Sequence, residues 1–392
     1  MISTRRTPLA AKNLAHDPRR LLIAICGIGF AVVLIFMETG FENALFDSTV
    51  KLFEDMNADI VIASKAQYAL LSGETFPRRR LYQARGCTGV EGVYPIYIEM
   101  YRGVWKPPGR KGNPIRVLAF DPQDPVFAIR SVAECGPRLQ QPETALIDAK
   151  SKAKHGVPES LEEVLRQRGG ELSEKALRLV GTFEMGTDFI SDGNLIMSAA
   201  NFAEYFPYRA GGEDPLSIVD VGIVHVCPGA DVQTVKNNLQ QNLPRDVAVY
   251  TKQDFIAHET KFWADSSPIG FVFFMGTMIG FMVGVIICYQ IIYSDIADHM
   301  AEFATLKAMG YRNRYFIAFV FQESLYLSVL SFAPGLLVSM AVFQALAAGT
   351  GLLMILNLQR VAFVFVLTAV MCIVSGCLAM HKVLAADPAE LF

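Results

Sequence analysis

The sequence predicts an α-helical membrane protein with four transmembrane helices and a mixed α/β periplasmic domain inserted between helices 1 and 2. Charged residues make up 19% of the 392 residues, below the roughly 25% usual for soluble proteins, and the mean hydropathy is +0.32. Four stretches contain no Asp, Glu, Lys or Arg: Leu21–Met37, Ser266–Ser294, Ser324–Gln359 and Val361–Met380. Mostly apolar runs of about 18 or more residues are typical of membrane spans. The polar stretch of about 220 residues after the first run has the length of one or two soluble domains.

The charges beside the apolar runs predict the orientation of the chain. Residues 1–20 contain five Lys or Arg and one acidic residue, and Lys307, Arg312 and Arg314 follow the second run. Because positive residues are retained in the cytoplasm, we expect an inner (plasma) membrane protein with both termini cytoplasmic and a periplasmic insert. A cleaved signal peptide is the alternative for the first run, but its apolar core would be only about 7–15 residues long.

These observations divide the chain into nine predicted segments. They are a cytoplasmic N-terminal segment (1–20), transmembrane helix 1 (21–41), a periplasmic α/β domain with stalk helices (42–264), transmembrane helix 2 (265–294), a cytoplasmic coupling-helix loop (295–314), transmembrane helix 3 (315–346), a short periplasmic turn (347–359), transmembrane helix 4 (360–380) and a cytoplasmic tail (381–392). Pro334-Gly335 is a predicted kink in helix 3.

The insert alternates strand and helix patterns. Strands are predicted at Ala58–Ser64, Val93–Tyr101, Ile115–Phe120, Val221–Val226 and Asp246–Tyr250, and helices at Phe41–Met56, Val232–Leu243 and Gln253–Trp263. We expect Pro142–Leu172 to be a helical insertion, with Glu159–Arg168 as its clearest helix. Three cysteines fall in the insert, Cys87, Cys135 and Cys227. They permit one disulfide but not a disulfide framework.

Several kinds of chemistry have no motif in the sequence. The net charge of −3 gives no reason to expect a nucleic-acid partner. The chain lacks a P-loop GxxxxGK[ST], a zinc-protease HExxH and a GxSxG nucleophile motif, and its six histidines are scattered. We therefore expect no enzyme activity, metal or cofactor on this chain.

The second predicted span carries Gly276, Gly280 and Gly284 on one helix face. Small residues at this spacing allow another helix backbone to approach closely. The pattern predicts a close helix contact, without indicating which helix packs there, and a contact across a permease dimer is one arrangement.

Two further polar features stand out. Glu323 lies early in the third span, where a carboxylate is expected to face the bundle or a wet surface. It has either a coupling or gating role or a structural one, as a polar contact between helices. Arg78, Arg79 and Arg80 in the insert form either a solvated charged face or a contact for a partner protein or lipid headgroups.

The inner loop is the most informative stretch, because Asp298–Met309 has a helix pattern that Gly310 ends. It combines apolar Met300, Phe303, Leu306 and Met309 with charged Glu302 and Lys307. A short helix of this kind lies either on lipid or in a groove of a cytoplasmic partner.

This loop also carries a resemblance to a known family. AEFATLKAMGYRNRYF resembles the E-x-A/G-x-L-[KR]-A-[LM]-G motif of ABC permeases of the MacB/FtsX type, and the tail 386–391 resembles their D-P-x-E-x-L ending. Glu323 matches a glutamate often found early in the third span of that family. The sequences FMETGFENAL, FPRRRLYQA and DIADHMAEFATLKAMG resemble the DevC permeases of cyanobacteria, which are associated with export of heterocyst glycolipid.

The resemblance implies a permease subunit of an ATP-driven tripartite exporter. It implies a homodimer of permeases, a DevA-like ATPase that binds ATP and Mg²⁺, a DevB-like membrane-fusion protein of the HlyD type and a TolC-like outer-membrane channel. ATPase closure would push the inner-loop helix, and the outer domain would drive glycolipid or other lipid-like cargo outward. The alternatives are an FtsX-like non-transporting transmission protein, a lipoprotein-releasing permease of the LolC/LolE type, and a ligand sensor.

The predicted topology can be tested with reporter fusions. A reporter that is active only in the periplasm should give signal when fused at Gly212 and none when fused at Phe392. The reverse pattern at either position would contradict four spans with both termini cytoplasmic.

Overall fold

The computed structural model describes residues 18–157, 169–188, 190–265, 268–300, 305–307, 309–350 and 356–385. The chain divides into two units. The helical unit contains Met1–Asn43, Pro268–Leu346 and Met354–Phe392, and the α/β unit contains Ala44–Ser267 and Ala347–Leu353. Each unit has buried apolar clusters of its own.

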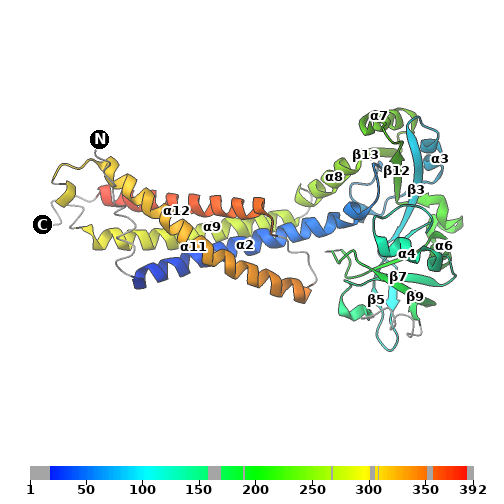
Figure 1. The fold of residues 1–392 in the computed structure, drawn as a ribbon, viewed down its shortest axis with the longest axis horizontal. Helices are drawn as coiled ribbons and strands as arrows, with labels where there is room; N and C mark the ends of the chain where they lie inside the picture. Colours follow the sequence, from blue (N-terminus) through cyan, green and yellow to red (C-terminus); the bar gives the residue numbers. More distant parts are fainter. Residues whose placement is uncertain are drawn as a thin grey trace. The chain divides into compact units, whose positions relative to one another are not determined.

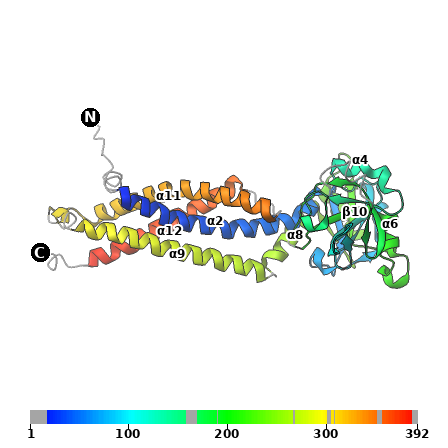
Figure 2. The same ribbon diagram turned by 90° about the horizontal axis from the view of Figure 1, so that it is seen from below.

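The helical unit consists of long helices that lie side by side (Figure 1 and Figure 2). They are α2 (Pro18–Asp55), α9 (Pro268–Asp298), α11 (Asn313–Thr350) and α12 (Leu358–Ala385). All four are long enough and apolar enough to cross a membrane, by length and composition. The prediction of four long apolar helices is therefore confirmed.

The ends of these helices differ from the predicted segments, and α9 continues to Asp298, past the expected end at residue 294. α11 is helical through Pro334 and continues to Thr350, past the expected end at Leu346. The predicted turn at 347–359 therefore begins later, because the alanine-rich sequence after Leu346 favours helix; residues 351–355 lie outside the described residues. α12 continues to Ala385, past the expected end at Met380.

Small and hydroxylated side chains fill the interior of the helical unit. Ser324, Ser328, Ser331 and Ser339 on α11 are fully buried. On α12, the hydroxyl of Ser375 donates to the Val285 carbonyl oxygen of α9 at 2.9 Å. Such residues let helices approach closely and supply polar contacts between them.

The α/β unit is built on one large sheet. Eleven of the described strands form it, in the order β13-β1-β12-β3-β6-β10-β7-β9-β8-β4-β5, and β2 pairs with β11 separately. The strands are β1 (Ile60–Ser64), β2 (Phe76–Pro77), β3 (Val90–Glu99), β4 (Val104–Lys106), β5 (Asn113–Pro114), β6 (Arg116–Phe120), β7 (Thr144–Asp148), β8 (Gly170–Leu172), β9 (Lys175–Phe183), β10 (Asn194–Ser198), β11 (Ile218–Val219), β12 (Val221–Val226) and β13 (Val247–Thr251). The pairs β6–β10 and β7–β9 are parallel, and the other pairs are antiparallel.

Both faces of this sheet are buried, which explains why its central strands are apolar without alternation. In β1, Ile60 and Ile62 belong to one apolar cluster, and Val61 and Ala63 belong to the other. The first cluster is covered by α3 (Arg79–Arg85), α6 (Ala199–Tyr205) and α7 (Val232–Asn242). The second is covered by the end of α2, α4 (Arg130–Leu139) and α8 (Lys252–Asp265).

The prediction that Pro142–Leu172 is a helical insertion is wrong. Thr144–Asp148 is strand β7, fully buried between β10 and β9, and Gly170–Leu172 is strand β8. The segment Thr-Ala-Leu-Ile-Asp has only three apolar residues, which are too few to show a periodicity that separates helix from strand. Its hydrogen bonds to β9 and β10 establish it as a strand. The predicted helix Glu159–Arg168 lies outside the described residues.

The cysteines of the α/β unit do not form disulfides in this structure. Cys87, Cys135 and Cys227 are all free thiols. Burial raises the pKa of the Cys87 and Cys135 thiols above its usual value. Raised thiol pKa values are expected of structural cysteines and not of reactive ones.

A buried carboxyl group joins α8 to the segment after β1. Glu259 is 1% exposed, and its Oε1 accepts a hydrogen bond from the Leu70 backbone N–H at 2.9 Å. Burial raises the pKa of Glu259 from 4.5 to about 7, although the hydrogen bond from Leu70 acts in the opposite direction. The folded chain therefore retains a proton at Glu259 in a pH range where the unfolded chain has lost it.

This carboxyl group makes the stability of the α/β unit dependent on pH. Because the folded-state pKa is raised, the free energy of unfolding should fall as the pH rises from about 4.5 to about 7. Glu259→Gln keeps an acceptor for Leu70 and should flatten this profile. At about 1.4 kcal/mol per pKa unit, it should stabilise the unit by up to about 3 kcal/mol at pH 8.

Urea unfolding followed by tryptophan fluorescence measures this effect, because both tryptophans, Trp105 and Trp263, lie in the α/β unit. Glu171→Gln is the matched control, since the Glu171 side chain is 51% exposed. If the free energy of unfolding depended on pH in the same way for the parent chain and Glu259→Gln, the pH dependence would not come from Glu259.

Candidate functional site

The end of α9 is tied to the start of α2 by charge. Asp298, the last residue of α9, forms an ion pair with Arg20 on the first turn of α2. His299 then folds back onto α9, where its Nδ1 lies 2.9 Å from the Asp295 carbonyl oxygen. A displacement of the chain just after α9 would therefore act on both helices.

The predicted inner-loop helix ends at Gly310, as the sequence indicates. The Gly310 N–H donates to the Lys307 carbonyl oxygen at 3.0 Å, and the Tyr311 N–H donates to the Leu306 carbonyl oxygen at 3.2 Å. Gly310 has a φ of +93°. This pair of bonds with a left-handed glycine is a Schellman motif, which ends a helix and satisfies its last carbonyl groups.

The apolar residues of the inner loop are not equally available to a partner. Met300 and Leu306 pack against the buried cluster of the helical unit. Met309 is 64% exposed and Tyr311 is 45% exposed. Of the other predicted coupling residues, Lys307 is exposed, whereas Glu302 and Phe303 lie outside the described residues. Sequence reasoning missed Tyr311, because it follows the glycine that ends the helix pattern.

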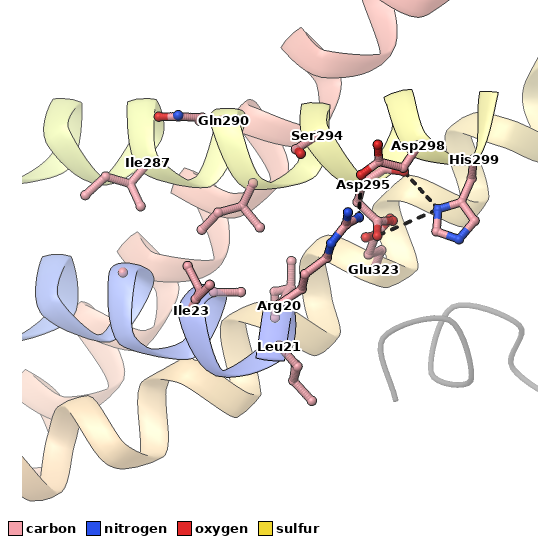
Figure 3. Close-up of a pocket in the computed structure, with 14 residues that line it drawn as sticks. Arg20, Leu21, Ile23, Ile287, Gln290, Ser294, Asp295, Asp298, His299 and Glu323 are labelled. Carbon is pink, nitrogen blue, oxygen red and sulfur yellow. Dashed lines mark hydrogen bonds and ion pairs between the residues drawn. The ribbon is translucent and has the colours of Figure 1, made fainter. Parts of the chain in front are cut away.

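A cavity of about 560 Å³ lies between α2, α9 and α11 near this end of the helical unit (Figure 3). Its apolar lining consists of Leu21, Ile23, Ala24, Ile287, Ile291 and Leu327. Its polar end is formed chiefly by Arg20, Asp295, Asp298, His299 and Glu323. The cavity thus has one apolar wall and one charged end.

The structure gives Glu323 a partner on another helix. Its side chain is 1% exposed and shares a hydrogen bond with the Asp295 side chain of α9. Two carboxylate ions offer only acceptors, so a hydrogen bond between two carboxyl groups contains one proton. This contact is a polar link between two helices, which was one of the two alternatives for Glu323. Glu323 also lines the cavity, where the other alternative, a coupling or gating role, would operate.

The glycine face of α9 packs against helices of the same chain. A Cβ atom at Gly276 would overlap the Glu38 carboxyl group, and one at Gly280 would lie 3.5 Å from Ile35 Cγ1. At Gly284, it would overlap the Met371 sulfur and lie 2.9 Å from the Ala31 Cβ atom. The face therefore approaches α2 along its length and α12 at one end.

The three arginines of the predicted cluster differ in their contacts. Arg80 pairs with Asp246, its Nη2 lying 2.6 Å from Oδ2, and its side chain is only 12% exposed. Its hydrogen bonds hold the pKa of Asp246 below its usual value. Arg79 is exposed, and the Arg78 guanidinium lies 5.8 Å from the ring centre of Tyr82, which is 63% exposed. Arg78, Arg79 and Tyr82 thus remain available for a partner.

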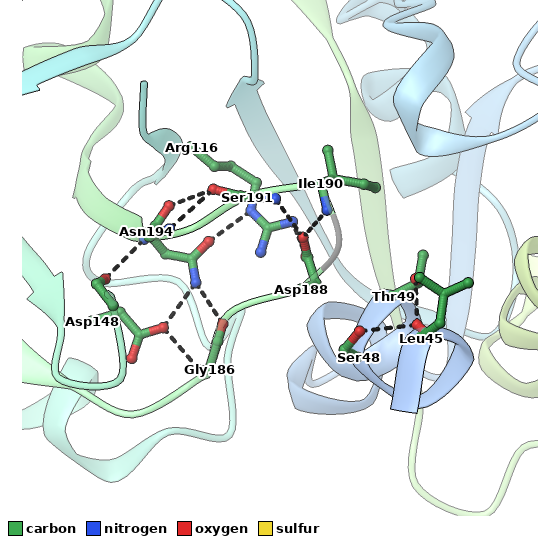
Figure 4. A network of polar contacts seen from close by, with 12 residues as sticks. Leu45, Ser48, Thr49, Arg116, Asp148, Gly186, Asp188, Ile190, Ser191 and Asn194 are labelled. Carbon is green, nitrogen blue, oxygen red and sulfur yellow. Dashed lines mark hydrogen bonds and ion pairs between the residues drawn. The ribbon is translucent and has the colours of Figure 1, made fainter. Parts of the chain in front are cut away.

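A buried polar network orders the loop between β9 and β10 (Figure 4). Arg116 pairs with Asp188 at 2.5 Å, and both side chains are almost fully buried. The Arg116 Nε also donates to Asn194 Oδ1, and Asn194 Nδ2 donates to Asp148 Oδ2, each at 2.8 Å. Each buried charge has partners, so the network is structural. No motif along the chain predicts this network.

A second polar cavity, of about 410 Å³, lies in the α/β unit. Tyr208 donates to Glu99 Oε2 at 2.6 Å, and the Arg209 Nη2 lies 2.6 Å from Asp220 Oδ2. Burial raises the pKa of Asp220 to about 6, against the opposing effect of Arg209. Two other buried atoms of the lining, Gln67 Oε1 and Arg209 Nε, have no hydrogen-bond partner among the described residues.

Metal chemistry has no support among the described residues. They contain no group of three or more His, Cys, Asp or Glu side chains placed to hold a metal ion.

Comparisons with known proteins bear mainly on the helical unit. Residues 270–388 match the family described as FtsX-like permease C-terminal. No curated protein matches the chain's sequence significantly. The matched segment contains α9, α11, α12 and the inner loop, which supports the MacB/FtsX-type resemblance.

Solved structures similar to the chain share little sequence with it. The periplasmic region of MacB from Actinobacillus actinomycetemcomitans is similar at 9% identity and a TM-score of 0.35, over 51% of this chain and 92% of that chain. The extracellular domain of the ABC-type transporter YknZ from Gram-positive bacteria is similar at 8% identity and a TM-score of 0.32, over 50% of this chain and 100% of that chain.

The glycine face of α9 gives a test within one helix. Gly284→Ala should destabilise the helical unit by about 1–3 kcal/mol, because the added methyl group meets the fixed Cβ atom of Ala31. Gly280→Ala should be tolerated, because its methyl group reaches only ordinary contact distance from Ile35. Thermal unfolding in detergent measures the difference. Equal stability of the two variants would contradict close packing at Gly284.

Proposed function

We propose that the chain is the permease subunit of an ATP-driven tripartite ABC exporter. In this proposal it transmits closure of a separate ATPase to a periplasmic domain, which drives cargo toward a membrane-fusion protein and an outer-membrane channel. The observation that carries the proposal is the match of residues 270–388 to the FtsX-like permease C-terminal family. That segment contains both the last three long helices and the inner loop.

The proposal places the four long helices in the inner membrane. Their lengths and composition suit a membrane span, and a helix satisfies its own backbone hydrogen bonds in lipid. The charge pattern then puts both termini and the inner loop in the cytoplasm and the α/β unit in the periplasm.

Energy has to come from a partner in this proposal, because the sequence contains no P-loop. The inner loop offers a docking surface, since Met309 and Tyr311 are exposed beside a Schellman motif that holds the turn in one conformation. The ion pair between Arg20 and Asp298 connects the base of α9 to α2. Movement of the inner loop would therefore shift two helices together. ATP and Mg²⁺ belong to the ATPase, and we expect no cofactor or catalysis on this chain.

α2 is suited to carry that movement. It is helical without a break over 38 residues, which corresponds to about 57 Å at 1.5 Å per residue. Its residues Ile35 and Phe36 are buried in the helical unit, and Leu52 and Phe53 are buried in the α/β unit. One continuous helix therefore contributes apolar side chains to both cores.

The remaining partners follow from the same proposal. Two permeases form a homodimer, and the α/β unit binds a membrane-fusion protein of the HlyD type that leads to a TolC-like channel. Arg78, Arg79 and Tyr82 are a candidate contact for this adaptor, because arginine and tyrosine are enriched where partner proteins bind. A DevC-like exporter of glycolipid or another lipid-like cargo is the specific form that we propose.

An FtsX-like transmission protein is the second candidate, since the matching family is described as FtsX-like permease C-terminal. It would use the same inner loop and α2 but regulate a periplasmic enzyme instead of moving cargo. A lipoprotein-releasing permease is a third form of the same architecture. An adjacent gene for an HlyD-like adaptor would favour export, and one for a hydrolase would favour transmission alone.

Docking of the ATPase can be tested at the exposed residues of the inner loop. We expect the Met309→Ala/Tyr311→Ala double variant to lose about tenfold or more in ATPase affinity, because truncating an interface anchor removes most of its binding energy. Lys307→Ala should have a smaller, salt-sensitive effect. Co-purification of the ATPase at matched permease levels is the measurement.

The matched control is Met278→Ala/Tyr326→Ala, which truncates the same residue types at exposed positions on α9 and α11. We expect this control variant to co-purify with as much ATPase as the parent does. Leu306→Ala does not test docking alone, because Leu306 packs against the buried cluster of the helical unit. Its truncation should also lower the stability of that unit. If the Met309/Tyr311 variant recovered as much ATPase as the parent, a loop resting on lipid would be the better description.

A further inference from the structure

The cavity between α2, α9 and α11 has a lining that suits an amphiphile. Its volume of about 560 Å³ falls within the range of about 300–1,000 Å³ that is usual for ligand pockets. Apolar side chains of all three helices form its wall, and charged groups gather at one end. A ligand that fills it would need an apolar body and a polar head.

The charged end has an excess of acid. Asp295, Asp298 and Glu323 face one arginine, Arg20, and one histidine, His299. Arg20 pairs with Asp298, and Figure 3 shows both of them at the same end of the cavity as Glu323. The carboxyl side chains at this end outnumber the basic ones, so a cation would balance the charge there.

Glu323 has bonding capacity that the chain does not use. Its side chain is 99% buried, and its Oε2 atom has no hydrogen-bond partner among the described residues. An unsatisfied buried carboxyl oxygen is costly. A donor that enters the cavity would remove that cost.

The geometry points to a binding site for an amphiphile whose head is a primary ammonium group. An ammonium group offers three donors and no acceptor, which matches Glu323 and Asp295, and its charge balances the acidic end. An anionic head does not fit, because the acidic side chains outnumber Arg20. The alkyl part would lie against Ile23, Ile287 and Ile291.

Two sources could supply this chemistry. One is a bilayer lipid with an ethanolamine head, and the other is a smaller cationic amphiphile that the protein carries or responds to. Both would place an ammonium group beside Glu323. The site does not depend on an ATPase, so its test is independent of the coupling proposal.

Binding of radiolabelled dodecylammonium to the purified full chain in nonionic detergent tests the site. The parent should bind it at least tenfold more tightly than Glu323→Gln does, and dodecanol should compete poorly. Ser294→Phe provides a second block, because Ser294 is an exposed residue of the cavity lining. Ala297→Phe is its matched control, since Ala297 is exposed on the same turn of α9 but does not line the cavity.

The lipid arm uses native mass spectrometry with equal amounts of phosphatidylethanolamine and phosphatidylglycerol. Ethanolamine lipid retained by the parent and lost in both cavity variants would identify the bilayer as the source. Dodecylammonium binding without that lipid preference would identify a smaller cationic amphiphile. Equal dodecylammonium binding by the parent, Glu323→Gln and Ser294→Phe, or equal competition by dodecanol, would overturn the proposal.

Discussion

The glycine face of α9 lets both α2 and α12 pack close to that helix. Glycines at positions 276, 280 and 284 leave no side chain between the helices, and Ile35 and Ala31 of α2 occupy that space. Because α9 is held this near to α2, its last turn brings Asp298 to Arg20. The cavity and its charged end exist only because the two helices meet there and α11 adds Glu323.

The α/β unit depends on a different constraint, which is the burial of both faces of one sheet. Alternate residues of β1 and β6 enter two separate apolar clusters, so the sheet needs helices on each side. The end of α2 supplies part of one cover, with Leu52 and Phe53. Ile35 and Phe36 of the same helix are buried in the helical unit, so α2 contributes to a core in each unit.

The buried network around Arg116 and the buried carboxyl group of Glu323 differ in how fully they are hydrogen-bonded. In the α/β unit, Arg116, Asp188 and Asn194 satisfy one another, and such a network orders a loop without offering a site. In the helical unit, Glu323 keeps one oxygen atom unpartnered among the described residues. Where burying a polar group costs most, an unpaired carboxyl oxygen is the stronger indication of a ligand.

The sequence by itself determined the parts of the protein that rest on composition and local pattern. Runs without charge predicted the four long helices, because an uncharged and mostly apolar run of about 18 or more residues is typical of a membrane span. Strand patterns predicted β1, β6 and β12, and Gly310 predicted the end of the inner-loop helix, because these signals are local. Gly276, Gly280 and Gly284 were recognised as a packing face for the same reason.

Only the tertiary structure decided which strands pair and which side chains come into contact. β7 is a strand because β9 and β10 pair with it on either side, and its three apolar residues are too few to show a periodicity. Gly335 packs against Val32, and Gly376 against Val320, but neither belongs to a repeat that could be read in advance. The exposure of Met309 and the burial of Leu306 depend on the cluster beneath them. The partnership of Glu323 with Asp295 joins residues on different helices, so it is fixed by helix packing and not by spacing along the chain.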